Sequence, residues 1–280
     1  MNPLVTTAPL VSTQWLAAHL NEVRVVDASW YMPDEKRQPA REFEAGHIPG
    51  AVFFDIDGIA DRTSGLPHML PTPGEFSKAV GALGIGDGEM VVVYDGSGVF
   101  SAPRVWWTLK AMGHNDVKVL DGGFPKWKRE GRAVETGPTQ PAAKFFTAIR
   151  EPALVRDFDD VMGIVKDNSA QIVDARSPGR FLAQEPEPRA GVRGGHMPGA
   201  LNVHYRKLIA EDGTLKPPDQ LRAAFDAVNP DRPIVTTCGS GLTAAILVLA
   251  LDEIGASDVA LYDGSWTEWG SRPEAPVVAR

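Results

Sequence analysis

The chain contains a single cysteine, Cys238, which excludes an internal disulfide and any zinc cage built from several cysteines. Its six histidines are scattered without a paired helical spacing, so we expect no bound metal. No block of basic residues is present and the net charge is −8, which argues against nucleic acid as a partner. The longest apolar run, residues 242–251, is too short to span a membrane, so no membrane association is expected.

These absences also bear on the setting of the protein. A lone thiol suits a reducing compartment, and residues 1–20 lack the pattern of a secretory signal, so we expect a cytoplasmic protein. A hydrophobic content of 43% with 23% charged residues is typical of a globular protein. Few basic or amphipathic patches stand out, and we therefore expect a monomer.

What the sequence does contain is an internal repeat. The first half reads "VRVVDASW" and then "REFEAGHIPGAVFFDI", and the second half reads "AQIVDARSPGRF" and then "RGGHMPGALNVHY". Asp27 thereby pairs with Asp174, and His47 pairs with His196. Farther on, "MVVVYDGSG" is matched by "PIVTTCGSG". Two copies of one domain are the simplest explanation.

Each copy alternates short apolar strands with helices, which predicts an α/β fold with a mostly parallel sheet flanked by helices on both faces. Strands are expected at 23–27 and 172–174, and again after each Gly-His-x-Pro-Gly turn, at 51–55 and 200–204. The repeat predicts one domain at 1–137 and a second at 155–280. Residues 138–154, rich in proline and without either period, are expected to form a linker.

The differences between the copies point to the chemistry. Residues present in both copies, such as His47 and His196, are assigned to the fold, because one active site needs them only once. The largest difference is that Asp95 stands in the first copy where Cys238 stands in the second. The first copy thus has no thiol nucleophile.

Cys238 follows an expected strand at 233–237 and precedes a helix expected to start near Leu242, which places it where ligands bind in open α/β sheets. Gly239 and Gly241, on either side of Ser240, let the backbone curl so that its N–H groups form an anion nest. The nest and the helix N-terminus would both stabilise a thiolate. The alternative is that Cys238 is a small buried hydrophobe.

Two enzyme classes are disfavoured by neighbouring residues. Cysteine phosphatases need an arginine six positions after the cysteine, and that position is Ala244. A serine hydrolase would need glycine two residues before Ser240, and that residue is Cys238.

Two copies of a Gly-His-x-Pro-Gly domain with cysteine only in the second resemble the rhodanese superfamily of sulfurtransferases. The resemblance runs from about Ser12 to Trp269 and implies tandem rhodanese-like domains. The loop "CGSGLT", which includes Leu242 and Thr243, is similar to the substrate-binding loop of the family's 3-mercaptopyruvate branch. Thiosulfate-preferring members usually carry Arg-Lys after the cysteine, where this chain has Gly239 and Ser240.

The resemblance implies further site residues. Arg180 and Arg189 would hold the donor carboxylate, although on residue types alone surface ion pairs with Glu185 and Glu187 fit equally well. Ser240, His68 and Asp57 would form a proton relay that assists the cysteine. Without the resemblance, an exposed His68 and a capping or ion-paired Asp57 are the better interpretation. The expected site therefore comprises Cys238, Ser240, His68, Asp57, Arg180, Arg189, Gly239, Gly241, Leu242 and Thr243.

The implied activity is that of a 3-mercaptopyruvate sulfurtransferase. Cys238 would take sulfur from 3-mercaptopyruvate as a persulfide, release pyruvate, and pass the sulfur to cyanide or to a thiol such as reduced thioredoxin, with no metal or organic cofactor. The alternatives are a thiosulfate:cyanide sulfurtransferase and a sulfur-carrier module that docks a partner without turning over free donor.

Overall fold

The computed structural model describes residues 8–279, which divide into two compact units. Unit 1 takes in the chain up to Ile59 together with Pro71–Glu151 and Ala210–Leu215. Unit 2 takes in Ala60–Leu70, Pro152–Ile209 and the chain from Lys216 onward. Each unit therefore includes a short segment whose sequence neighbours belong to the other unit.

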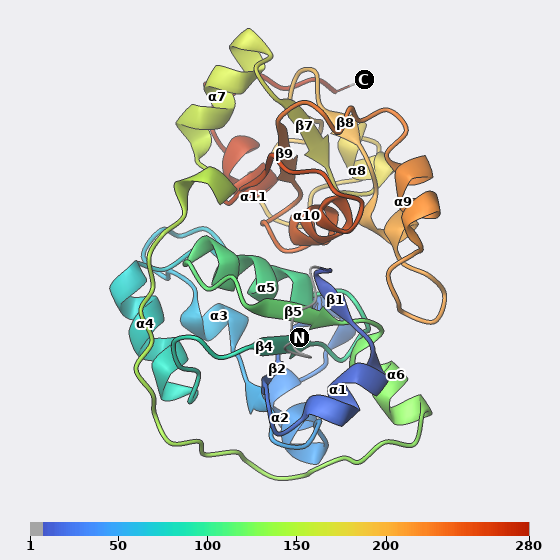
Figure 1. Cartoon of the computed structure of the whole chain (residues 1–280). Helices are drawn as coiled ribbons and strands as arrows, with labels where there is room; N and C mark the ends of the chain where they lie inside the picture. The colour runs from blue at the N-terminus through green and yellow to red at the C-terminus, as the bar shows by residue number, and fades with distance from the viewer. Residues whose placement is uncertain (1–7, 280) are drawn as a thin grey trace. The chain divides into compact units, whose positions relative to one another are not determined.

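Unit 1 is built on a parallel sheet in which the described strands follow the order β1-β5-β4-β2-β3 (Figure 1). The central strand β4 has the sequence VVVY and is buried throughout, as expected for a strand covered on both faces. The elements are β1 (Leu10–Val11), α1 (Thr13–His19), β2 (Arg24–Asp27), the 3₁₀ turn η1 (Pro33–Glu35), α2 (Pro39–Ala45), β3 (Val52–Phe53), α3 (Ile56–Ile59), α4 (Pro73–Ala82), β4 (Val91–Tyr94), α5 (Ala102–Ala111), β5 (Val117–Leu120) and α6 (Gly123–Arg129).

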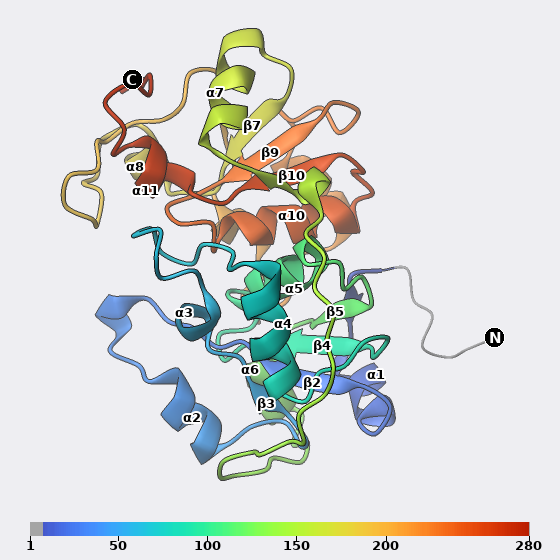
Figure 2. The ribbon, with the colours of Figure 1, turned by 90° about the vertical axis from the view of Figure 1, so that its left-hand side faces the viewer.

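Unit 2 repeats this topology, with the described strands in the order β6-β10-β9-β7-β8, all parallel (Figure 2). Its central strand is β9. The elements are η2 (Pro152–Leu154), β6 (Val155–Arg156), α7 (Phe158–Asp167), β7 (Gln171–Asp174), α8 (Pro178–Phe181), β8 (Leu201–Asn202), η3 (Tyr205–Leu208), α9 (Pro218–Ala224), β9 (Ile234–Thr237), α10 (Ala244–Glu253), β10 (Val259–Tyr262) and α11 (Ser265–Trp269).

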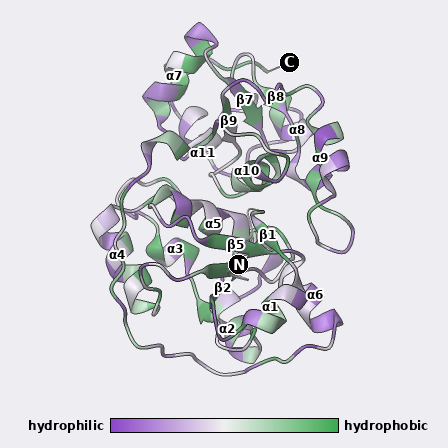
Figure 3. Cartoon of the chain, in the orientation of Figure 1, coloured by the Kyte–Doolittle hydropathy of each residue, from purple (hydrophilic) through white to green (hydrophobic). Residues whose placement is uncertain are grey.

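Alternate residues of each central strand face opposite layers of helices. In β4, Val92 and Tyr94 join a core cluster with residues of α1, α2 and α6, while α5 packs against β4 and β5. In β9, Val235 joins the equivalent cluster with α7 and α11, while α10 packs against β9 and β10. The strands are correspondingly green in Figure 3, whereas α7 alternates between purple and green. The predicted fold class, two parallel sheets each covered by helices, is confirmed.

The structure differs from the sequence expectations mainly in the lengths of elements. The strands expected at 51–55 and 200–204 shrink to the two-residue β3 and β8, because the chain turns into α3 or η3 directly afterwards. Helix α10 begins at Ala244 rather than near Leu242, and the two-residue β1 and β6 were not expected. Such short strands carry no periodicity by which a sequence could reveal them.

The expected linker is tied to unit 1 over most of its length. Residues 136–151 contain no helix or strand, yet the Lys144 N–H donates to the Gly81 carbonyl over 2.9 Å. Farther along, Thr147 binds the Asp87 carboxylate, and Phe146 is buried. The domain limits 1–137 and 155–280 stay a prediction about the repeat. No helix between residues 8 and 279 is both long and apolar enough to cross a bilayer.

Candidate functional site

The two histidines of the repeated turn occupy equivalent places. The His47 ring stacks on Phe43 and its Nδ1 lies 2.8 Å from the Phe43 carbonyl oxygen. The His196 ring stacks on Phe181 with the same 2.8 Å contact to the Phe181 carbonyl. Both rings are buried, so each histidine pins the turn of its own unit. Neither is a candidate for the chemistry.

Cys238 directly follows β9, the strand that lies between β10 and β7 in the middle of the unit 2 sheet. The residue is only 1% exposed. Its N–H donates to Ser265 Oγ over 3.3 Å, and its carbonyl accepts from the Trp266 N–H over 2.9 Å. Ser265 has a φ of 50°, in the left-handed region that is unfavourable for a residue with a side chain. Strain of this kind is concentrated at functional sites.

The cysteine loop, residues 238–243, turns sharply into α10. Gly241 has a φ of 76°, a conformation that glycine adopts at no steric cost. Among the residues that the structure describes, none accepts a hydrogen bond from the backbone N–H of Ser240, Thr243 or Ala244. The loop therefore presents main-chain donors at the carboxyl end of the sheet, where a negatively charged group would satisfy them.

The equivalent loop of unit 1 shows what such donors hold. Asp95 Oδ2 accepts hydrogen bonds from the N–H groups of Phe100, Ser101 and Ala102 at 2.8–2.9 Å. Its Oδ1 accepts from the Ser97 N–H over 2.8 Å. Unit 1 thus fills its own nest of amides with a buried carboxylate.

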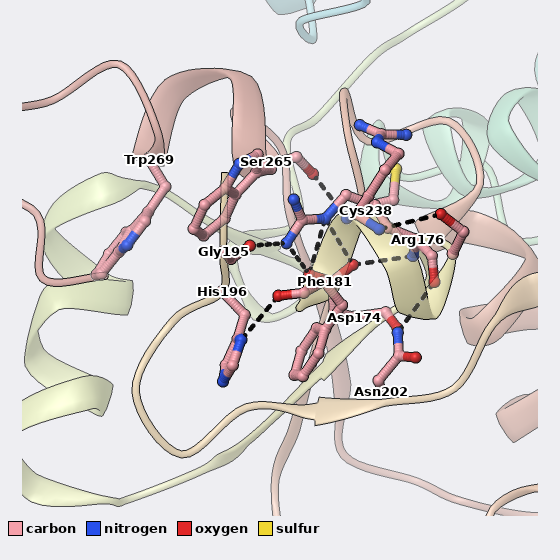
Figure 4. A network of polar contacts seen from close by, with 12 residues as sticks. Asp174, Arg176, Phe181, Gly195, His196, Asn202, Cys238, Ser265 and Trp269 are labelled. Carbon is pink, nitrogen blue, oxygen red and sulfur yellow. Dashed lines mark hydrogen bonds and ion pairs between the residues drawn. The ribbon is translucent and has the colours of Figure 1, made fainter. Parts of the chain in front are cut away.

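A line of four alternating charges lies beside the cysteine loop, and Figure 4 labels two of its members, Asp174 and Arg176. Arg176 Nε and Nη2 bind both carboxylate oxygens of Asp174 at 2.6–3.1 Å, and Arg176 Nη1 donates to Glu187 over 2.8 Å. Glu187 in turn accepts from Arg180. The side chains of Asp174, Arg176 and Glu187 are 1%, 1% and 4% exposed, and that of Arg180 is 19% exposed. We call these four residues the charge chain.

Arg176 is fixed on every side. Its Nη2 also donates to the Gly195 carbonyl, and its guanidinium lies 4.1 Å from the ring centroid of Trp266. Burial alone would lower the pKa of Arg176, but the charges of Asp174 and Glu187 raise it above the ordinary value. Arg176 is therefore a permanent cation.

Arg180 closes the line nearest to the cysteine. A Cβ atom added to Gly239 would lie 3.0 Å from Arg180 Nη2 and 3.7 Å from Nη1, so the end of the guanidinium lies over the residue that follows Cys238. The structure thus brings Arg180 to the loop. It also shows the pair with Glu187 that was the alternative interpretation, although Glu187 is buried rather than at the surface.

His68 lies beside the same loop, within unit 2. It belongs to the Ala60–Leu70 segment, which joins this unit although it comes from the first half of the sequence. His68 Nδ1 is 3.2 Å from Ser240 Oγ and 3.3 Å from the Ser240 carbonyl oxygen, and the residue is 5% exposed. The Leu70 N–H donates to Asp263 Oδ2 over 2.8 Å and fixes the end of the segment. The structure therefore places His68 in hydrogen-bonding range of Ser240.

Four further residues were expected at the site: Asp57, Arg189, Leu242 and Thr243. Asp57 is in α3 of unit 1, where its Oδ2 accepts from Trp30 Nε1 over 2.9 Å. Arg189 is half-buried, two residues beyond Glu187. Leu242 is buried and Thr243 is the N-cap residue of α10. Within residues 8–279, no three His, Cys, Asp or Glu side chains gather as a metal site would require.

Three residues of this site escaped the sequence analysis: Arg176, Glu187 as a buried group, and Ser265. A signal existed for two of them. Arg176 stands where the first copy has Ser29, and Ser265 stands where it has Gly123, so both differ between the copies as Cys238 does. Nothing in the sequence distinguishes the buried Glu187 from the exposed Glu185.

Comparison with known proteins agrees with this architecture. The rhodanese-like domain family matches residues 12–130 and 157–272. The chain is 44% identical to the human 3-mercaptopyruvate sulfurtransferase, covering 95% of this chain and 93% of that protein. It is 43% identical to the mitochondrial thiosulfate/3-mercaptopyruvate sulfurtransferase 1 of Arabidopsis thaliana, covering 97% and 78%. The crystal structure of SseA from Escherichia coli, described as a 3-mercaptopyruvate sulfotransferase with the rhodanese fold, superposes with a TM-score of 0.85 at 42% identity, covering 92% of this chain and 99% of that one. The chain belongs to the rhodanese family of sulfurtransferases.

Proposed function

We propose that this protein is a 3-mercaptopyruvate sulfurtransferase that works through a persulfide on Cys238. The observation that carries the proposal is the cysteine loop: a single thiol at the carboxyl end of a central strand, in a turn where the amides of Ser240, Thr243 and Ala244 have no acceptor among the described residues. The names of the relatives in human and Arabidopsis support the choice of donor.

The transfer balances without an oxidant. The Cys238 thiolate attacks the donor sulfur, the carbon–sulfur bond of 3-mercaptopyruvate breaks, and its electrons leave on the enolate of pyruvate. The enolate carbon takes up the proton that the donor thiol brought, and pyruvate departs. A thiol acceptor such as reduced thioredoxin, or cyanide in an assay, then removes the outer sulfur and restores the thiolate.

The neighbouring side chains have roles to match. Arg180 and Arg189 bind the donor carboxylate through charge-assisted hydrogen bonds. His68, in hydrogen-bonding range of Ser240, delivers the proton to the enolate, and Asp57 assists as the third member of the relay. Gly239, Gly241, Leu242 and Thr243 shape the loop that receives the transferred sulfur as an anion.

Thiosulfate is the competing donor, and it appears beside 3-mercaptopyruvate in the name of the Arabidopsis relative. Gly239 and Ser240 give this loop no cationic side chain of its own, which favours a singly charged carboxylate donor over a dianion. The same proposal includes a thiol such as reduced thioredoxin as the acceptor, and a monomeric state. It also includes the domain limits 1–137 and 155–280, and a cytoplasmic location in keeping with the lone thiol.

Steady-state kinetics with both donors test it. We expect a higher kcat/KM for 3-mercaptopyruvate than for thiosulfate, and loss of pyruvate release by at least about 10³-fold in Cys238→Ser. A clear preference for thiosulfate would overturn the donor assignment, and normal turnover by the serine variant would overturn the nucleophile. A persistent sulfur adduct without pyruvate release would indicate a carrier module instead.

A further inference from the structure

Glu187 uses only one edge of Arg180. Its carboxylate binds Nε over 3.2 Å and Nη2 over 2.5 Å, a side-on pairing that occupies the Nε–Nη2 edge of the guanidinium. Arg180 Nη1 makes no hydrogen bond to any residue that the structure describes. The edge formed by Nη1 and the second N–H of Nη2 therefore remains available, and a second carboxylate fits a guanidinium through two parallel hydrogen bonds.

The available edge faces the cysteine loop. The distances of 3.0 Å and 3.7 Å from a Cβ on Gly239 to Nη2 and Nη1 show that these two atoms lie over the residue after Cys238. Without a partner on its other edge, the guanidinium would be free to rotate about its side-chain bonds and to offer any of its N–H groups. With Glu187 in place, it offers one edge in one direction.

Glu187 is itself held rigidly from behind. Arg176 Nη1 donates to the Glu187 oxygen that also accepts from Arg180 Nε, and Arg176 is locked by Asp174, Gly195 and the ring of Trp266. The charge chain balances two carboxylates against two guanidiniums, so its buried members are all paired. Arg180, the most exposed of the four, keeps Nη1 entirely without a partner among the described residues.

We propose that Glu187 is a positioning residue that acts through Arg180: it holds the Nη1–Nη2 edge toward Cys238 so that the donor carboxylate docks with its sulfur at the thiolate. This inference rests on the proposed function, because it takes an α-keto acid donor as substrate. Glu187 thus contributes to donor binding through Arg180 and without touching the donor itself.

The test is the effect of Glu187→Gln on KM and kcat for 3-mercaptopyruvate. The amide keeps the size of the side chain but loses the charge and places N–H groups against a guanidinium. We expect KM to rise about tenfold or more while kcat changes little, because misplacing a binding group weakens docking. Glu187→Asp, which keeps the charge on a shorter side chain, should recover part of the loss. Glu185→Gln is the matched control: Glu185 accepts a hydrogen bond from Ser177 and should leave KM unchanged.

A double-mutant cycle separates positioning from simple support of the fold. If Glu187 acts through Arg180, Glu187→Gln adds almost nothing to the KM of an Arg180→Ala variant. If Glu187 only stabilises unit 2, Glu187→Gln leaves KM unchanged even when Arg180 is present, and lowers kcat and Tm instead. That pattern would overturn the inference.

Calorimetric measurement of pyruvate binding allows the Glu187 inference and the proposed function to be tested separately. Pyruvate carries the same α-keto carboxylate but requires no turnover. If the wild type releases no pyruvate from 3-mercaptopyruvate, the proposed function fails, and Glu187 is judged by whether Glu187→Gln weakens pyruvate binding. If turnover is as proposed and both KM and pyruvate affinity are unchanged in Glu187→Gln, only the Glu187 inference fails.

Discussion

The loops after β4 and β9 share one backbone plan and differ in what fills it. In unit 1, the Asp95 carboxylate accepts hydrogen bonds from four amides. The Tyr31 hydroxyl covers Gly96 so closely that a Cβ atom added there would lie only 2.2 Å from the hydroxyl oxygen. In unit 2, Cys238 stands at the start of the loop, the amides of Ser240, Thr243 and Ala244 have no acceptor among the described residues, and Arg180 lies over Gly239. A saturated nest stabilises its unit, whereas an unsaturated one can receive an anion from outside. The same scaffold thus serves stability in one unit and chemistry in the other.

The largest effect is expected when the cysteine loop is made to resemble its counterpart. Cys238→Asp should place a carboxylate against the open amides and remove the nucleophile, so sulfur transfer should fall by at least about 10⁴-fold. Because those amides gain an acceptor, the variant should be at least as stable toward urea as Cys238→Ser. A clearly less stable aspartate variant would show that the two loops do not present their amides alike.

Removing the carboxylate from the loop of unit 1 should destabilise that unit. Asp95→Ala strips the acceptor from four N–H groups, of which those of Ser101 and Ala102 are buried, and we expect a loss of about 3–5 kcal/mol in the free energy of unfolding. Asp95→Asn keeps one carbonyl oxygen and should lose less. Urea denaturation with hydrogen exchange measured on α5 locates the effect. Wild-type stability in Asp95→Ala would mean that the carboxylate contributes nothing to the loop.

A third comparison concerns the buried aspartates Asp27 and Asp174. Asp174 faces Arg176, whereas Asp27 has only Ser29 in that position, and burial raises the pKa of Asp27 to about 6, against hydrogen bonds from Ser29 that lower it. The folded state holds this proton more tightly than the unfolded chain does. The contribution of protonated Asp27 to the free energy of unfolding is therefore complete below pH 4 and is lost as pH rises through 6. The loss amounts to about 3 kcal/mol.

Asp27→Asn should remove this pH dependence, so that unfolding free energies measured at pH 4 and pH 7 differ less than in the wild type. The matched change in unit 2, Asp174→Asn, should lower the free energy of unfolding instead of removing a pH dependence. Asp174→Asn leaves Arg176 with one fewer counter-charge in a buried site and should destabilise the protein at both pH values. Equal pH profiles for wild type and Asp27→Asn would contradict the assignment.

The smallest effect is expected at Ser265, whose counterpart is Gly123. Ser265→Gly relieves a left-handed backbone but removes the hydrogen bonds of Oγ to the Cys238 N–H and the Tyr262 carbonyl, so stability should change by less than about 1 kcal/mol. Activity should fall severalfold because the backbone of Cys238 loses a support. Ser265→Ala keeps the strain and should be the less stable of the two. Unchanged activity in both would show that the serine does not hold the nucleophile in place.

Much of the fold was predictable because the chain states it twice. Repetition separated the structural pair His47 and His196 from the unmatched Cys238, and the β-branched runs located β2 and β7 to within about a residue. Burial was not predictable: Glu187 and Glu185 are alike in sequence, yet only the first meets two arginines in the interior. The contact of His68 with Ser240 was expected from the family resemblance alone, because it follows from tertiary packing that no local pattern encodes.

The segment Ala60–Leu70 has an evolutionary consequence. It is encoded in the front half of the gene but folds with the back half, and Ala210–Leu215 makes the reciprocal crossing. After such an exchange, the duplicated halves can no longer be parted at the repeat boundary, because the piece carrying Cys238 would leave His68 behind. Unit 2 is therefore complete only when both halves of the chain are present.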